Sequence, residues 1–182
     1  MYYEEKTMKS ERVYEGKILN LRVDTVELPN RKYSKREIVE HGSSVVIIPI
    51  MDDNSVLMVK QYRKAIDKVV LEFPAGLVES GEDPKEAALR ELQEEVGYTA
   101  NKIEYIYDFY TSPGFTDERI NVFVASDLIP SDMVCDEDEF LEIVKIDLNE
   151  LIEKLHNYEL FDAKAIIGAQ YLEILRNKNE SK

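Results

Sequence analysis

Alternation of apolar and polar side chains predicts a β-hairpin near the start of the chain. Apolar or β-branched residues occupy every second position from Leu19 to Thr25, which places them on one face of a strand. Pro29 and Asn30 then supply turn chemistry, and the segment 35–41 returns as the second strand. We therefore expect residues 1–43 to form a β-hairpin extension.

Further along, short apolar segments bounded by turn residues predict a sheet that is covered by helices. The expected strands are residues 45–50, 56–62, 69–73, 103–109, 120–125 and 140–146. The expected helices are residues 84–96, residues 148–155 and a third that begins after Asp162, a suitable N-cap. The order of strands, helix, strands and helices indicates an α+β fold with a mixed β-sheet, and residues 44–182 are expected to form one domain.

The first helix has clear signals at both of its ends. Asp83 is a suitable N-cap, Pro84 occupies the first helical position, and Glu86 follows the cap by three residues, as in a capping box. Gly97 can adopt the left-handed conformation that closes a helix. Leu92 and its neighbours one turn away form an apolar stripe, so we expect this helix to pack on the sheet.

The same helix carries several carboxylates close together. Glu91 and Glu95 are four residues apart and share a face, with Glu94 adjacent, although like charges at this spacing repel. Arg90 lies four residues before Glu94 and can pair with it. Such a cluster suits a hard cation such as Mg²⁺, which prefers oxygen ligands; a solvated acidic face is the alternative. Glycines in the preceding loop, where backbone can approach a ligand closely, favour the metal.

Residues 76–98 resemble the Nudix box, G-x5-E-x7-R-E-U-x-E-E-x-G-U, in which U is usually aliphatic. The one departure is Tyr98 at the last position, where it affects packing. The resemblance implies an α/β/α sandwich and a Mg²⁺-dependent hydrolase of nucleoside diphosphates linked to another group, with two or three ions per site and Mn²⁺ as a substitute. The metal ligands that it implies are the Ala75 carbonyl and the side chains of Glu82, Glu91, Glu94 and Glu95, of which Glu91 and Glu95 are the catalytic centre.

Residues outside the box indicate a subfamily. Pro113 lies sixteen residues after Gly97, where it resembles the marker proline of ADP-ribose pyrophosphatases. The flanks "VKQYRKAIDKVVLEFPAG" and "ELFDAKAIIGAQYL" resemble the same subfamily. The implied reaction is hydrolysis of ADP-ribose to AMP and ribose 5-phosphate. Two alternatives stay open: a pyrophosphatase for another nucleoside diphosphate sugar, and a non-catalytic module that senses ADP-ribose-like ligands.

The resemblance also implies residues that bind the substrate. Arg63 matches a basic residue near the phosphates, and Glu118 matches a residue near the terminal ribose. Arg36 is expected to approach the nucleotide across a dimer interface, and Glu72 to meet groups on the adenine side. The marker Pro113 completes this set of expected substrate-binding residues.

An acidic segment before the last expected strand contains the candidate catalytic base. In the subfamily that the chain resembles, a loop glutamate after the box acts as the base or as a further metal ligand. Glu139 directly precedes the strand at 140–146 and is the first choice, with Glu137 as the alternative. A loop carboxylate suits this role because it can close over bound substrate and activate water.

Composition narrows the class of protein further. The formal net charge of −14 argues against a partner that is a nucleic acid or an anionic membrane. The longest apolar run is far too short to cross a bilayer. A single cysteine and a start without a signal-peptide pattern predict a cytoplasmic protein. The resemblance implies a small-molecule substrate, ADP-ribose, and a homodimer that exchanges its N-terminal strands.

Overall fold

The computed structural model of the chain describes residues 3–132 and 140–180. The chain divides into two compact units. The first unit consists of Met1–Ser43 and Asp108–Ile120, and the second of Ser44–Tyr107 and Asn121–Lys182.

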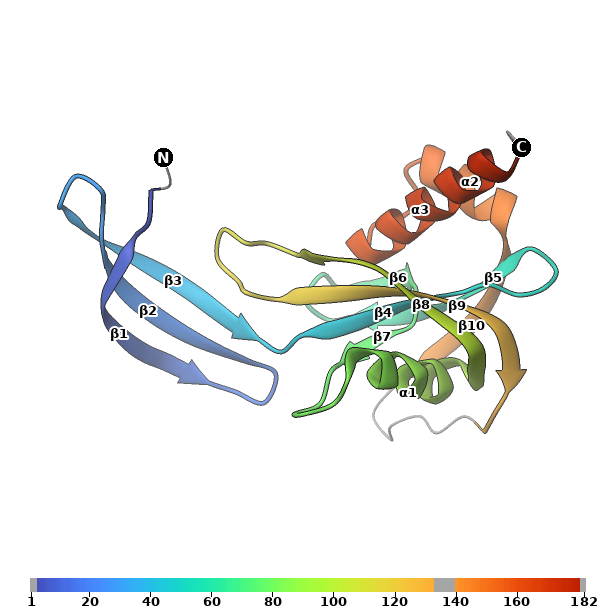
Figure 1. The fold of residues 1–182 in the computed structure, drawn as a ribbon, viewed down its shortest axis with the longest axis horizontal. Helices are drawn as coiled ribbons and strands as arrows, with labels where there is room; N and C mark the ends of the chain where they lie inside the picture. The colour runs from blue at the N-terminus through green and yellow to red at the C-terminus, as the bar shows by residue number, and fades with distance from the viewer. Residues whose placement is uncertain (1–2, 133–139, 181–182) are drawn as a thin grey trace. The chain divides into compact units, whose positions relative to one another are not determined.

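The first unit contains a sheet of three antiparallel strands in the order β1-β2-β3, drawn in shades of blue in Figure 1. These strands are β1 (Lys6–Glu15), β2 (Leu19–Glu27) and β3 (Tyr33–His41). The predicted hairpin is confirmed as β2 and β3, which pair from one end to the other. Strand β1 was not predicted, because its sequence is largely polar and every side chain in it is exposed.

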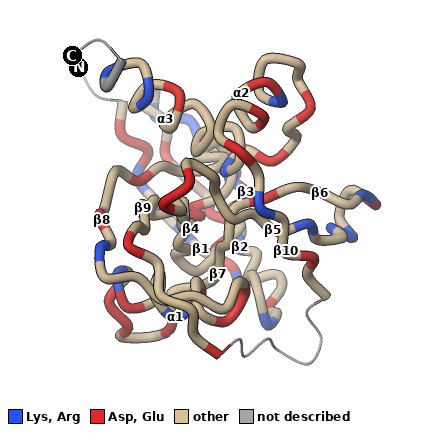
Figure 2. Tube along the Cα trace, turned by 90° about the vertical axis from the view of Figure 1, so that its right-hand side faces the viewer, with Lys and Arg blue, Asp and Glu red and all other residues tan. Residues whose placement is uncertain are grey.

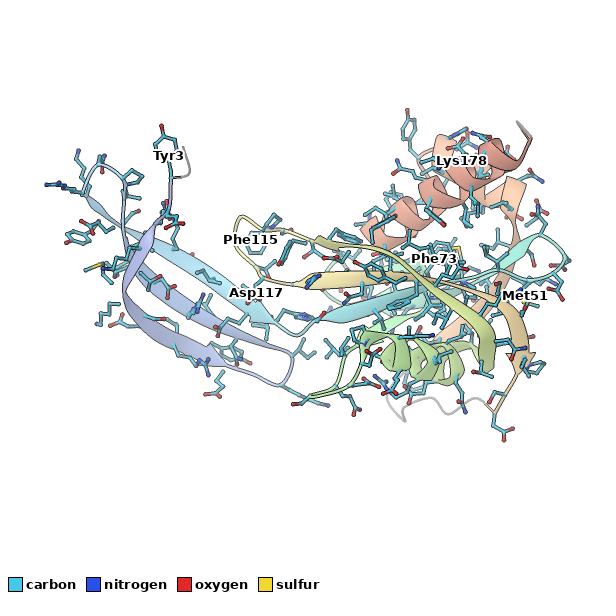
Figure 3. All side chains as sticks on the ribbon, viewed as in Figure 1. Tyr3, Met51, Phe73, Phe115, Asp117 and Lys178 are labelled. Atoms are coloured by element: carbon cyan, nitrogen blue, oxygen red, sulfur yellow. The ribbon has the colours of Figure 1, made fainter. Side chains whose placement is uncertain are left out.

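The segment Asp108–Ile120 is a turn with its two flanking strand ends, and it packs with the first unit. The Val39 N–H donates to the Phe115 carbonyl over 2.8 Å, and the His41 N–H donates to the Asp117 carboxylate over 2.9 Å. Figure 3 labels Phe115 and Asp117 on this turn. The sequence assigns residues 44–182 to one domain, and that boundary stays a prediction; the contacts of this segment with β3 leave no local pattern in the sequence.

The second unit is built on two sheets, with strand orders β10-β5-β6 and β7-β4-β9-β8. The strands are β4 (Ser44–Pro49), β5 (Ser55–Arg63), β6 (Lys68–Glu72), β7 (Ala75–Leu77), β8 (Tyr98–Tyr110), β9 (Arg119–Pro130) and β10 (Leu141–Asp147). The pairs β10–β5, β5–β6 and β4–β7 are antiparallel. Each strand predicted beyond residue 44 is present; β7 is an addition, too short to show a period in sequence.

Helices lie on both sides of these strands. They are α1 (Pro84–Val96), α2 (Leu148–His156) and α3 (Ala163–Glu180). Figure 1 shows α1 on one side and both α2 and α3 on the other. The predicted α+β fold with its α/β/α layering is confirmed.

Both sides of the second unit have an apolar core. On the α1 side, Ile47 and Leu92 belong to one cluster of buried side chains. On the α3 side, Phe73 is fully buried against Gly168, where an added Cβ atom would lie 2.5 Å from the Phe73 ring. Glycine therefore allows α3 to approach the sheet closely. Phe73, labelled in Figure 3, directly follows Glu72, so this contact fixes the strand end that carries Glu72.

Candidate active site

Helix α1 begins and ends where the sequence predicts. The Asp83 carboxylate accepts a hydrogen bond of 2.8 Å from the Lys85 N–H, as an N-cap does. Gly97 closes the helix with φ of 70°, and its N–H donates to the carbonyls of Leu92 and Gln93. With both ends capped and Leu92 fully buried, the helix is held in one rotation about its axis.

This rotation brings Glu91 and Glu95 against the backbone of β7. The Ala75 N–H donates to the Glu95 carboxylate over 3.1 Å. A Cβ atom at Gly76 would lie 2.0 Å from Glu91 Oε1, so only glycine leaves room for that carboxylate. Glu91 is 9 % and Glu95 5 % exposed. Two carboxylates this buried are not the ordinary solvated face that the sequence left as an alternative.

Arg90 is the cation at the centre of this carboxylate group. It donates two hydrogen bonds of 3.0 Å to Glu82, one of 2.7 Å to Glu91 and one of 2.9 Å to Glu94. It also donates to the Leu77 carbonyl over 2.9 Å, which ties the loop before α1 to the helix. The hydrogen bonds from Arg90 hold the pKa of Glu82 below its usual value. The predicted pair with Glu94 is confirmed, and Arg90 orients three carboxylates at once.

Glu82, Glu91, Glu94 and Glu95 carry four negative charges, and Arg90, which binds the first three of them, carries one positive charge. Figure 2 shows the acidic residues along α1 and the loop that precedes it. Within the described ranges, no three Asp, Glu, His or Cys side chains are arranged to hold a metal ion. Arg90 donates to both Glu91 and Glu94, which keeps their oxygens directed at itself. The donor set nevertheless fits a hard divalent cation, because it is made of oxygens and carries excess negative charge.

Arg63, at the end of β5, forms a side-on ion pair with Glu72, at the end of β6. Arg63 Nε donates to Glu72 Oε1 over 2.6 Å, and Nη2 donates to Oε2 over 2.8 Å. The Glu72 side chain is 2 % exposed and that of Arg63 43 %, so the pair reaches from the interior to solvent. Glu72 raises the pKa of Arg63, with a smaller contribution from Glu95. The Glu95 charge therefore acts on Arg63, and the pair borders the carboxylates of α1.

The sequence did not predict a third member of this ion pair. Lys164, in the first turn of α3, lies 2.9 Å from Glu72 Oε2 and 2.7 Å from Asp162. Asp162 also accepts from the Ala165 N–H over 2.8 Å, which confirms it as the cap of α3. The only signal in the sequence was the "DAK" of the flank that resembles the subfamily. A lysine at the start of a helix is usually exposed, and nothing local links it to a strand end.

Three of the expected substrate residues lie in the first unit. Pro113 is in the turn between β8 and β9, and the Glu118 carboxylate accepts from the Thr111 hydroxyl over 2.7 Å. Arg36, on β3, donates two hydrogen bonds of 2.8 Å and 2.6 Å to Glu5. The roles of Pro113, Glu118 and Arg36 in binding substrate stay predictions. Glu139 and its alternative Glu137 lie outside the described residues.

A cavity of about 410 Å³ shares no residue with these groups. It lies between the start of β5 and the helices α2 and α3, and most of its lining is apolar. Such a lining does not suit a pyrophosphate, so the cavity is not the site of the expected reaction.

In the part of the chain that the structure describes, no helix has the length and apolar character needed to cross a membrane.

Comparison with known proteins identifies the family. Residues 40–167 match the NUDIX domain, and residues 5–39 match the nucleoside diphosphate sugar hydrolase N-terminal domain. The chain is 45 % identical over 173 residues to an ADP-ribose pyrophosphatase of Bacillus subtilis (strain 168), covering 94 % of each protein. It is 44 % identical over 174 residues to a methanol dehydrogenase activator of Bacillus methanolicus, again covering 94 % of each.

A solved structure agrees with these sequence matches. The crystal structure of an ADP compounds hydrolase superposes with a TM-score of 0.85 at 26 % identity, and the match covers 97 % of this chain and 96 % of the other. The family profile spans well over half of the chain and includes the carboxylates around Arg90. The chain belongs to the Nudix hydrolase family.

Proposed function

We propose that this enzyme hydrolyses ADP-ribose to AMP and ribose 5-phosphate with Mg²⁺ bound at the carboxylates of α1. The observation that carries the proposal is the buried pair Glu91 and Glu95, pressed against the Ala75–Gly76 backbone. The name of the Bacillus subtilis relative, at 45 % identity over almost the whole chain, supports ADP-ribose as the substrate.

The metal is proposed to bind through Glu91 and Glu95, with the Ala75 carbonyl, Glu94 and Glu82 as further ligands. When bound, Mg²⁺ neutralises charge on a pyrophosphate and lowers the pKa of a bound water. The number of ions per site, two or three, and the use of Mn²⁺ belong to the same proposal.

The remaining residues are proposed to hold the substrate. Arg63 binds pyrophosphate oxygens, since its guanidinium is partly exposed beside the carboxylates. Pro113 and Glu118 contact the terminal ribose side, and Arg36 acts across a dimer interface. For Glu72, we replace the expected contact with adenine by a role in holding Arg63, because its buried carboxylate is already bound by two cations.

Purified protein is expected to release AMP from ADP-ribose in the presence of Mg²⁺, and this release is expected to stop when EDTA is added. The reason is that the carboxylates of α1 and a pyrophosphate are both negatively charged and repel each other unless a cation lies between them. AMP is measured by ion-pair chromatography, with GDP-mannose, UDP-glucose and ADP-glucose as comparison substrates.

Each result of that assay separates two functions. Hydrolysis of another nucleotide sugar but not of ADP-ribose would reject the substrate and retain the metal site. Binding of ADP-ribose with no turnover of any compound would instead favour the non-catalytic sensing module.

We also propose that the protein is a homodimer and that it acts in the cytoplasm. Strand β1 is at the edge of its sheet, and Met8, Val13 and Tyr14 on it are each at least 50 % exposed. An edge strand with apolar side chains is suited to pairing with another chain.

The proposed location in the cytoplasm rests on the cysteine content, because a single cysteine fits a reducing compartment.

Light scattering is expected to give twice the chain mass of 21.1 kDa, and Val13→Glu is expected to shift the protein toward monomer. Ile174→Glu is the matched control, because Ile174 is an exposed aliphatic residue on α3, in the second unit. A wild-type protein that is monomeric at micromolar concentration would reject the homodimer.

A further inference from the structure

We propose that Lys164 is a positioning residue for Arg63. It fixes the Glu72 carboxylate, which in turn holds the Arg63 guanidinium in the orientation that receives the substrate pyrophosphate. The part of this inference that concerns substrate rests on the proposed function, and the part that concerns Arg63 can be tested without substrate.

The first support is the way the Glu72 carboxylate is shared. Among the residues that the structure describes, Oε1 of Glu72 accepts from Arg63 alone, whereas Oε2 accepts from Arg63 at 2.8 Å and lies 2.9 Å from Lys164 Nζ. Glu72 is 2 % exposed, so water cannot readily replace Arg63 or Lys164 as a hydrogen-bond partner of its carboxylate. A carboxylate with one cation has freedom to rotate, while a carboxylate held by two cations at defined oxygens does not.

The second support is that Lys164 is itself fixed. Asp162, which caps α3 through the Ala165 N–H, lies 2.7 Å from Lys164 Nζ. Farther along the same helix, Gly168 packs closely on Phe73, the residue after Glu72. Helix α3 therefore holds the ammonium group against the end of β6 at two successive points of contact.

The third support is the charge balance. Arg63 and Lys164 face Glu72 and Asp162, two positive charges and two negative ones. Burial lowers the pKa of Lys164, but the nearby Asp162 and Glu72 outweigh burial and raise it, so the lysine is charged at neutral pH. Without Lys164 the group carries a net negative charge, and the Glu72 carboxylate loses the second cation that holds it.

The fourth support is the part of Arg63 that is left for a ligand. Nε and Nη2 are used by Glu72. In residues 3–132 and 140–180, no hydrogen bond is made by Nη1. A phosphate oxygen can therefore bind Nη1 without breaking the pair with Glu72, provided that the guanidinium stays in place.

Kinetics give the first test. Lys164→Met is expected to raise KM for ADP-ribose about tenfold, the size expected for loss of one charge-assisted hydrogen bond, and to change kcat less than threefold. Lys164→Arg should restore KM. Lys178→Met removes the same charge from the exposed end of α3 and should change neither constant. Because Lys164 acts through Arg63, Lys164→Met should have little further effect on KM in an Arg63→Met background.

A second measurement does not depend on substrate. The Nε–H of Arg63, identified by its loss in Arg63→Lys, is expected to exchange slowly with water in the wild type and in Lys164→Arg. It should exchange at least tenfold faster in Lys164→Met. If Lys164→Met does not fold, Lys164→Gln replaces it, since glutamine removes the charge and keeps a donor.

The results separate the two proposals. Absence of AMP release by the wild type would reject the proposed function, and the exchange rate would still decide the role of Lys164. Unchanged exchange in Lys164→Met would overturn the positioning role. Additive effects of Lys164→Met and Arg63→Met on KM would also overturn it, because they would mean that Lys164 contacts the substrate independently.

Discussion

Glu91→Gln and Glu95→Gln are each expected to lower kcat for ADP-ribose by about 10³-fold, because a metal site supplies several kcal/mol of charge stabilisation and about 1.4 kcal/mol corresponds to a factor of ten. Glutamine keeps the shape of the side chain and removes its charge. The two carboxylates are the most buried acids of α1, and each lies against the β7 backbone. Steady-state AMP release at saturating Mg²⁺ measures the effect.

Glu86→Gln is the matched control for these two variants. Glu86 lies on the same helix but is exposed, so the same loss of charge should leave kcat within about twofold of the wild type. Thermal melting checks that each variant is folded. A folded Glu91→Gln or Glu95→Gln variant with wild-type turnover would remove the metal assignment. Isothermal titration with Mg²⁺ should show weaker binding in both variants than in the control.

The features of this site that could be predicted from the sequence are those that depend on residues close together along the chain. The caps at Asp83 and Gly97 fix the length of α1, and the four-residue interval between Glu91 and Glu95 places both on one face. Burial of these acids could not be predicted in the same way. It depends on β7, a three-residue strand, and on Gly76, whose missing side chain admits the Glu91 carboxylate.

The parts that sequence could not predict join segments that are far apart along the chain. The contact of Lys164 with Glu72 depends on how α3 packs on the sheet, where Gly168 lies close to the Phe73 ring. The pairing of Val39 with the turn at Phe115 is of the same kind. Both are tertiary contacts, and the sequence that flanks each residue does not indicate which distant residue it contacts.

Glu139→Gln is expected to lower kcat by 10²- to 10⁴-fold, the usual contribution of a general base, and to change KM less. The expectation comes from the resemblance, since Glu139 lies outside the described residues. Strand β10, which follows it, begins with Leu141 paired to Gln61, two residues before Arg63 on β5. Strand β10 therefore lies beside the strand that carries the proposed phosphate-binding residue.

Glu137→Gln is the matched comparison for Glu139→Gln, because it removes the same charge two residues earlier in the same acidic segment. The decisive quantity is kcat at saturating ADP-ribose and Mg²⁺, measured across pH. Protonation of a general base lowers kcat as the pH falls. The acidic limb of the pH profile of kcat should therefore flatten in the variant that has lost the base, and it should persist in the variant that retains it. Loss of kcat in Glu137→Gln alone would transfer the role to Glu137. Full activity in both variants would mean that water is activated by groups outside this segment.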